Sequence, residues 1–165
     1  MPDLPATNGG EGKTGLRWLW LSALVIGLDQ LTKQWMAGML SLHEAIPLTG
    51  FFNLVMAHNT GAAFSMFADQ PGWQRGFFIS VALVATAVIL HLLRKPHPTV
   101  FHLALALILG GALGNVIDRA LFGYVIDFLD FYIGTWHWPA FNVADSAITV
   151  GAGLLIWDSF RQPKQ

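Results

Sequence analysis

The 165-residue chain contains no cysteine, so disulfides, thiolate metal sites and a cysteine nucleophile are all excluded. Charged residues are also scarce, at 12% of the chain, whereas soluble domains carry about 25%. The formal net charge is only −1, so nothing favours binding to nucleic acid. A His-Glu-x-x-His motif and a Gly-x-Ser-x-Gly elbow are both missing. We therefore expect neither a metal ion nor a cofactor.

Apolar sequence is what the chain has in abundance. Hydrophobic residues make up 54% of it, with seven Trp and twelve Phe. Four apolar segments each approach the roughly 20 residues that a helix needs to cross a bilayer. We predict one integral membrane domain with a flexible tail at 1–15 and transmembrane helices at 17–36, 76–93, 100–121 and 140–160.

Basic residues predict how these helices are oriented. Six of them flank the apolar segments on one side, at Lys13, Arg17, Arg94, Lys95, Arg161 and Lys164, whereas the connections on the other side hold only Arg75. Because short cytoplasmic loops are enriched in Lys and Arg, both termini are predicted to be cytoplasmic. The two longer connections, 37–75 and 122–139, should then lie on the outer side of the membrane.

The two outer connections differ in pattern. Between Gly50 and Phe64, apolar runs are broken by turn residues, which predicts a small antiparallel sheet ending in a turn at Asn59-Thr60-Gly61. The connection 122–139 is rich in aromatic residues, which suits an aromatic belt at the membrane interface. A short helix, a strand and a loop all remain open there.

The third apolar segment carries small and polar residues on defined faces. Gly110 and Gly114 are four residues apart, which predicts close contact between helices. Gly111, Asn115 and Arg119 follow one another at intervals of four and so share one face. Polar groups inside a membrane are usually functional, so we favour a functional role for Asn115 and Arg119.

Three other charged residues have simpler interpretations. Asp29 and Lys33 are four residues apart, the spacing of an ion pair within one helix, so we assign them a structural role. Asp118 lies beside the polar face of the third segment. We predict that it forms a salt bridge with Arg119 at the end of that helix.

Two aspartates are the strongest candidates for chemistry. Asp145 falls in the first turns of the last apolar segment, where the helix dipole favours a carboxylate, and Asn142 and Thr149 share its predicted face. Asp127 precedes that segment at a similar expected depth. We predict that the two carboxylates meet at the membrane surface and share one proton. The ionised member would take a proton from water while the protonated member polarises a carbonyl, as in aspartic proteases.

Several alternatives compete with this dyad. Asp130 lies three residues after Asp127, and we interpret it as a solvated loop charge. His58 is interpreted as a packed strand residue. Ser146 and Lys33 leave a serine–lysine pair open, although nothing in the sequence brings them together.

Two other classes of protein also carry polar groups in apolar segments. A proton-coupled transporter would place its carboxylates near the membrane midplane, often within repeated halves. An assembly protein would use glycine faces to hold partner helices. We find no internal repeat, and neither class explains two carboxylates at one outer edge.

The motifs together resemble the lipoprotein signal peptidase (signal peptidase II) family, and they cover most of the chain from Asp29 to Gly151. The matching stretches are Leu28-Asp29-Gln30 with Lys33, His58-Asn59-Thr60-Gly61-Ala62-Ala63-Phe64, Gly110-Gly111-Ala112-Leu113-Gly114-Asn115 with Asp118-Arg119, Val125-Ile126-Asp127-Phe128, and Phe141-Asn142-Val143-Ala144-Asp145-Ser146.

The resemblance implies a membrane bundle of four transmembrane helices in the bacterial inner membrane, with a small periplasmic β-sheet that cradles substrate and a short periplasmic helix or loop. It implies an aspartic endopeptidase that removes signal peptides from diacylglyceryl-modified prolipoproteins by cutting before the lipidated cysteine. Expected partners are these substrates, membrane lipid and globomycin-type inhibitors, and a monomer is expected.

The resemblance also implies roles for individual residues. Asp127 and Asp145 correspond to the catalytic dyad, near the periplasmic face. The expected supporting or ligand-binding residues are Asn59, Gly111, Asn115, Arg119 and Asn142. Asp29, with Lys33, corresponds to a position linked to stability.

Overall fold

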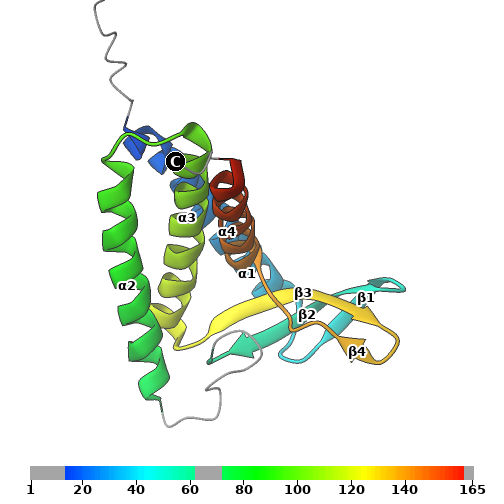
Figure 1. Cartoon of the computed structure of the whole chain (residues 1–165). Helices are drawn as coiled ribbons and strands as arrows, with labels where there is room; N and C mark the ends of the chain where they lie inside the picture. The colour runs from blue at the N-terminus through cyan, green and yellow to red at the C-terminus, as the bar shows by residue number, and fades with distance from the viewer. Residues whose placement is uncertain (1–13, 62–71, 162–165) are drawn as a thin grey trace, which may run out of the picture.

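The computed structural model describes residues 14–61 and 72–161, and it shows a helix bundle with a small sheet at one end (Figure 1). A 3-10 turn, η1, precedes the first helix. The central helix α3 contacts the other three helices. The elements of this helical part are η1 (Gly15–Trp18), α1 (Leu19–Met39), α2 (Trp73–Leu93), α3 (Thr99–Phe122) and α4 (Val143–Arg161).

Helices form where the apolar segments predict them, with ends shifted by a few residues. By length and composition, α2, α3 and α4 could each cross a membrane, whereas α1 does not reach the same hydropathy. The polar residues Asp29, Gln30 and Lys33 lie within α1 and lower its hydropathy. Most of the predicted tail at 1–15 lies outside the described residues, and so does the stretch 62–64 after the predicted turn.

Glycines on α3 allow the close helix contacts that their spacing predicts. A Cβ atom at Gly110 would lie 2.7 Å from the Cβ of Val25 on α1. A Cβ at Gly111 would overlap the backbone carbonyl of Ala144 on α4. Because a side chain at either position would displace a neighbouring helix, these glycines set the spacing of α3 from α1 and α4.

The sheet has four antiparallel strands in the order β1-β2-β3-β4. The predicted sheet of the first connection is present, with β2 (Phe52–Asn59) inside the predicted range and β1 (Ala45–Thr49) before it. The second connection contributes β3 (Val125–Ile133) and β4 (Trp136–His137). Of the alternatives that the sequence left open there, the structure shows strands. The nine-residue strand β3 pairs with β2 across the sheet, which joins the two connections into one unit.

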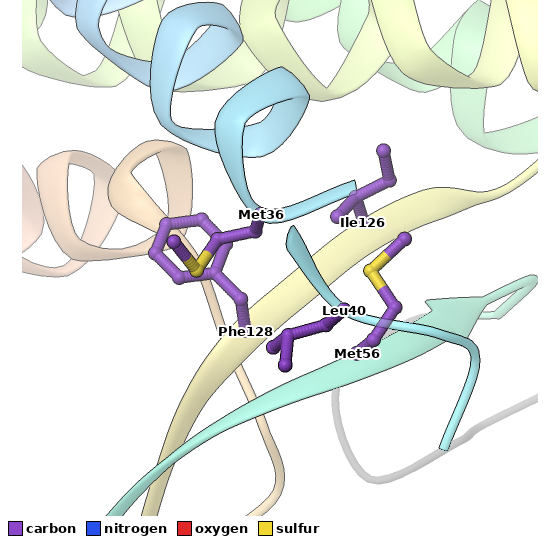
Figure 2. Packing of buried hydrophobic residues seen from close by; sticks show 5 residues of the cluster. All are labelled: Met36, Leu40, Met56, Ile126 and Phe128. Atoms are coloured by element: carbon purple, nitrogen blue, oxygen red, sulfur yellow. The ribbon is translucent and has the colours of Figure 1, made fainter. Parts of the chain in front are cut away.

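An apolar cluster joins the sheet to the end of α1 (Figure 2). Met36 and Leu40 from the helix pack against Met56 from β2 and against Ile126 and Phe128 from β3, and all five are buried. Successive side chains of a strand point to opposite faces of the sheet. The residue between Ile126 and Phe128 therefore points away from this cluster, toward the start of α4.

Candidate active site

Asp127 lies between Ile126 and Phe128 on β3, and its side chain is almost fully enclosed, with 2% of its surface exposed. The Asn59 side-chain amide donates to Oδ2 at 3.0 Å, and the Asn142 amide donates to Oδ1 at 2.7 Å. Burial raises the pKa of Asp127 to about 7, and repulsion from Asp145 adds to that rise. The two amide hydrogen bonds oppose the pKa shift without cancelling it. Asp127 therefore holds a proton up to about neutral pH.

Asp145 is positioned by the beginning of α4. The predicted shared face with Asp145 requires Asn142 to lie within this helix. Asn142 instead immediately precedes the helix and caps it. The backbone N–H of Asp145 donates to Oδ1 of Asn142 at 2.9 Å, and the N–H of Ser146 donates to the Asn142 carbonyl at 3.1 Å. Asp145 is thus in the first turn, where the helix dipole stabilises a carboxylate.

Two side-chain amides connect the carboxylates. Asn115 on α3 donates to Oδ1 of Asp145 at 2.8 Å. Asn142, which donates to Asp127, also donates to Oδ1 of Asn115 at 3.3 Å. The predicted pair from β3 and α4 is therefore held in one hydrogen-bonded network.

Lys33 lies directly behind this network and is fully buried. Its ammonium group is 2.7 Å from Oδ2 of Asp29 and 3.0 Å from Oδ2 of Asp118. It also donates to Oδ1 of Asn115 at 3.0 Å, which aims the NH₂ of that amide at Asp145. The predicted Asp29–Lys33 contact is confirmed. The predicted Asp118–Arg119 salt bridge is wrong, because Asp118 points into the bundle toward Lys33.

The two buried partners of Lys33 also hold the backbone next to each carboxylate. Oδ1 of Asp29 accepts from the N–H of Ala144 at 2.9 Å, one residue before Asp145. Oδ2 of Asp118 accepts from the N–H of Ile126 at 3.1 Å, one residue before Asp127. One ammonium group thus organises the acceptors that fix the start of α4 and strand β3.

Arg119 and the Asn59 turn form the opposite wall. Arg119 donates from Nη2 to the carbonyl of Gly61 at 2.6 Å, and its guanidinium lies 5.0 Å from the ring centre of Phe78. The Gly61 N–H donates to Oδ1 of Asn59 at 3.0 Å, so the predicted turn at 59–61 is present. This wall and the two carboxylates opposite it enclose a cavity of about 800 Å³, which also extends along α4 from Ser146 to Val150.

Within the described residues, the structure decides two of the alternatives to the dyad. Ser146 donates its hydroxyl to the Asn142 carbonyl at 2.9 Å, whereas Lys33 contacts Asp29, Asp118 and Asn115, so no serine–lysine pair forms. His58 stacks on Tyr124 with ring centres 3.7 Å apart, as expected of a packed residue.

Asp130 is not the solvated loop charge that we expected. It lies on β3 with 6% of its surface exposed and accepts hydrogen bonds from Asn53 and His137.

Among residues 14–61 and 72–161, no cluster of three His, Asp or Glu side chains could hold a metal ion. The cavity itself is lined by the two linked carboxylates and by the amides of Asn59 and Asn115.

A bundle of apolar helices with two carboxylates on one enclosed cavity defines an α-helical membrane protein with an acid–base site. Comparisons identify its family. Residues 21–161 match the profile of a protein family described as "Signal peptidase (SPase) II". The chain therefore belongs to the signal peptidase II family, a family of peptidases.

Individual relatives agree with this assignment. The chain is 56% identical over 146 residues to the lipoprotein signal peptidase of Burkholderia mallei (strain SAVP1), covering 88% of each chain. It is 51% identical over 150 residues to the lipoprotein signal peptidase of Psychromonas ingrahamii, covering 90% of this chain and 87% of the relative. A solved structure described as a bacterial membrane enzyme superposes with a TM-score of 0.81 at 27% identity, covering 92% of this chain and 98% of that one.

Proposed function

We propose that Asp127 and Asp145 are the catalytic pair of an aspartic endopeptidase that removes signal peptides from prolipoproteins. The observation that carries the proposal is their joint position: two carboxylates from different elements line one cavity and are connected through Asn142 and Asn115. No other pair of titratable side chains among the described residues lines that cavity with such support. The relatives named lipoprotein signal peptidase support the substrate class.

The different surroundings of the two carboxylates suggest how they divide the reaction. Asp127, with a pKa of about 7, carries the proton and donates it toward the scissile carbonyl oxygen. Asp145, held by Asn115 and by the helix N-terminus, is the ionised member. It takes a proton from a water molecule whose oxygen then bonds to the carbonyl carbon.

Collapse of the resulting tetrahedral intermediate breaks the C–N bond. The amine nitrogen leaves with the proton that Asp145 took from water. One hydroxyl of the intermediate returns its proton to Asp127, which leaves a carboxyl group on the signal peptide. Asn59 and Arg119 line the same cavity, where their N–H groups can stabilise negative charge that develops on the carbonyl oxygen. Gly111 supports the site from behind, because it lets α4 approach α3.

The membrane setting follows from the same arrangement. In this proposal, the chain is a single inner-membrane domain in which α1 joins α2, α3 and α4 as a fourth spanning helix. Its polar face would be covered by α3 and α4, where Asp29 and Lys33 are buried. Both termini are cytoplasmic, the sheet and cavity face the periplasm, and the protein acts as a monomer.

The substrate is proposed to carry diacylglycerol on the cysteine that follows the cut. The cavity extends along α4 past Thr149 to Val150, two exposed positions on a membrane-spanning helix. A scissile bond next to a lipid-held cysteine could therefore reach the carboxylates from the side, without the lipid leaving the bilayer. Globomycin-type inhibitors are proposed to occupy the same cavity.

Purified protein incubated with a prolipoprotein tests this proposal. The diacylglyceryl-modified substrate should be cut immediately before its cysteine, with both products identified by mass, and globomycin should block the cut. The same prolipoprotein without lipid serves as the control and should be cut far more slowly. Intact modified substrate after incubation with folded protein would contradict the proposal.

A further inference from the structure

A second polar cluster lies on the face of the sheet opposite Asp127. Asp127 and Asp130 are three residues apart on β3, and alternation along a strand puts them on opposite faces. The Asn53 amide of β2 donates to Oδ2 of Asp130 at 2.8 Å. Nδ1 of His137 on β4 lies 2.9 Å from both carboxylate oxygens. The cluster therefore connects three adjacent strands through their side chains.

Between an imidazole N–H and a carboxylate oxygen, the N–H donates and the oxygen accepts. In the tautomer with a hydrogen on Nδ1, His137 therefore donates to Asp130. The imidazole also stacks on Tyr132, with ring centres 5.1 Å apart, and the Tyr132 hydroxyl donates to the carbonyl of Thr49 at 3.0 Å. A buried carboxylate needs such partners, since burial without them is costly.

His137 directly precedes the segment Trp138–Ala140, and the Trp138 ring lies edge-on to that of Trp136 with ring centres 6.1 Å apart. The Trp138 N–H donates to the carbonyl of Phe131 at 2.8 Å, and the Phe141 N–H donates to that of Leu129 at 3.1 Å. These bonds hold the two ends of the segment, and Pro139 between them has no N–H to donate. Strand β4 has only two residues, so the Asp130–His137 contact adds a side-chain link to the backbone bond at the first end.

This segment is also a wall of the catalytic cavity. Trp138, Pro139 and Ala140 line the cavity that contains Asp127 and Asp145. The same three residues line a second, more open cavity of about 590 Å³ that is bordered by Asn53, Asp130 and His137. A displacement of the segment on one face therefore changes the shape of the catalytic cavity on the other.

We propose that Asp130 and His137 are positioning residues that hold the Trp138–Ala140 wall where the substrate binds. The inference rests on the proposed function, in which this cavity receives a prolipoprotein. The pair should affect substrate binding more than chemistry. Phe141 is tied to β3 independently, since its carbonyl accepts from the N–H groups of Phe128 and Leu129 at 3.0 and 2.9 Å. Asn142 and the dyad behind it therefore stay in place when the wall moves.

Two substitutions at one position separate the hydrogen bond from the ring. His137→Phe keeps an aromatic ring against Tyr132 and removes the donor to Asp130. His137→Asn keeps a donor close to the Nδ1 position. We expect His137→Phe to raise KM about fivefold, the factor for one ordinary hydrogen bond, with kcat within about twofold. His137→Asn should largely restore KM, and His91→Phe, at an exposed site on α2, should leave both constants unchanged.

Amide hydrogen exchange provides a readout that does not depend on cleavage. His137→Phe should accelerate exchange at Trp138 and leave the amides of Asp127 and Phe128 unchanged. A normal KM for His137→Phe, or unchanged exchange at Trp138, would overturn the inference. A fall in kcat and thermal stability at constant KM would show a purely structural role and would also overturn it. If the wild-type protein cuts no prolipoprotein, the proposed function fails, whereas exchange at Trp138 still decides whether His137 holds the wall.

Discussion

At the scale of single residues, the site depends on giving two identical side chains different surroundings. Asp127 lies on a strand, is almost fully buried and has a raised pKa of about 7. Asp145 begins a helix, where backbone dipoles favour its negative charge. Pairs of titratable groups whose environments differ in this way are the usual signature of an acid and a base at work together.

The raised pKa of Asp127 predicts how stability depends on pH. Its folded-state pKa of about 7 lies above the ordinary value of 3.8, so the folded chain binds a proton that the unfolded chain releases. The free energy of unfolding should therefore fall as the pH rises between about 4 and 7. Asp127→Asn removes the titrating carboxyl group, so the free energy of unfolding of this variant should not show that fall. Thermal unfolding of both proteins in detergent across that range should show curves that diverge toward neutral pH, and parallel curves would refute the assignment.

Lys33 predicts a loss of both stability and activity when its charge is removed. Lys33→Met leaves the carboxylates of Asp29 and Asp118 buried without their cation, a change that typically costs about 3–5 kcal/mol. It also frees the amide of Asn115 to rotate away from Asp145. Unfolding and cleavage assays on Lys33→Met should show both losses. Lys95→Met, at an exposed position, is the control and should behave like the wild type.

At the scale of elements, the contact between α3 and α4 sets the distance between Asp145, the proposed catalytic residue on α4, and its amide partner Asn115 on α3. Gly111→Ala should push the helices apart, because the new Cβ would overlap the Ala144 carbonyl. We expect a loss of about 1–3 kcal/mol in stability. A displacement of about 1 Å in the site can cost about 100-fold in rate.

Gly153→Ala is the matched control for that substitution. Gly153 lies on α4, and a Cβ there would meet nothing within 4 Å among the described residues. Its unfolding temperature and cleavage rate should equal or exceed those of the wild type, since Ala favours a helix over Gly. Equal behaviour of the two alanine variants would show that the close approach at Gly111 is unimportant.

Sequence alone predicts the helices well, because long apolar runs have few alternatives. It predicts β2 from apolar runs broken by turn residues, but it places no strand at β1 and leaves the second connection undecided. Strand β3 is recognisable only through its partner β2, and those residues are about seventy positions away in the chain. The same limit explains Asp130: its partner Asn53 comes from β2, so the sequence pattern alone suggests solvent exposure.

For the candidate site too, the sequence predicts some features and leaves others unpredicted. Asp145 and Asn115 put polar groups where an apolar segment should have none, and that signal is local. The role of Lys33 at the centre is not local, because its partners come from α1 and α3. The spacing of Asp29 and Lys33 indicates only an ion pair within one helix. The charge of Asp118 inside the third apolar segment was the available hint of a further partner.

At the scale of the whole molecule, the sheet extends from the end of the bundle at which α4 begins (Figure 1). The cavity lies where sheet and helices meet, and it is lined by strand residues at one side and by α4 at the other. This position suits a substrate that is held partly in lipid and partly in water. The proposed orientation then places the sheet outside the cytoplasm.

The absence of native cysteine makes that orientation directly testable. Glu44→Cys lies at an exposed position beside the sheet, and Lys95→Cys lies at an exposed position between α2 and α3. In intact cells, a membrane-impermeant thiol reagent that reaches the periplasm should label the first variant and spare the second. Both should react after the membrane is permeabilised. Labelling of Lys95→Cys in intact cells would reverse the proposed orientation.

The most direct test of the account is the rate of prolipoprotein cleavage by proteins in which each carboxylate is replaced singly. Asp127→Asn and Asp145→Asn should each insert into the membrane, remain folded and lose nearly all cleavage. Glu44→Gln, which alters an exposed carboxylate on the same side, should cleave normally. Cleavage at the wild-type rate by either folded aspartate variant would contradict the claim that the two carboxylates act as a pair.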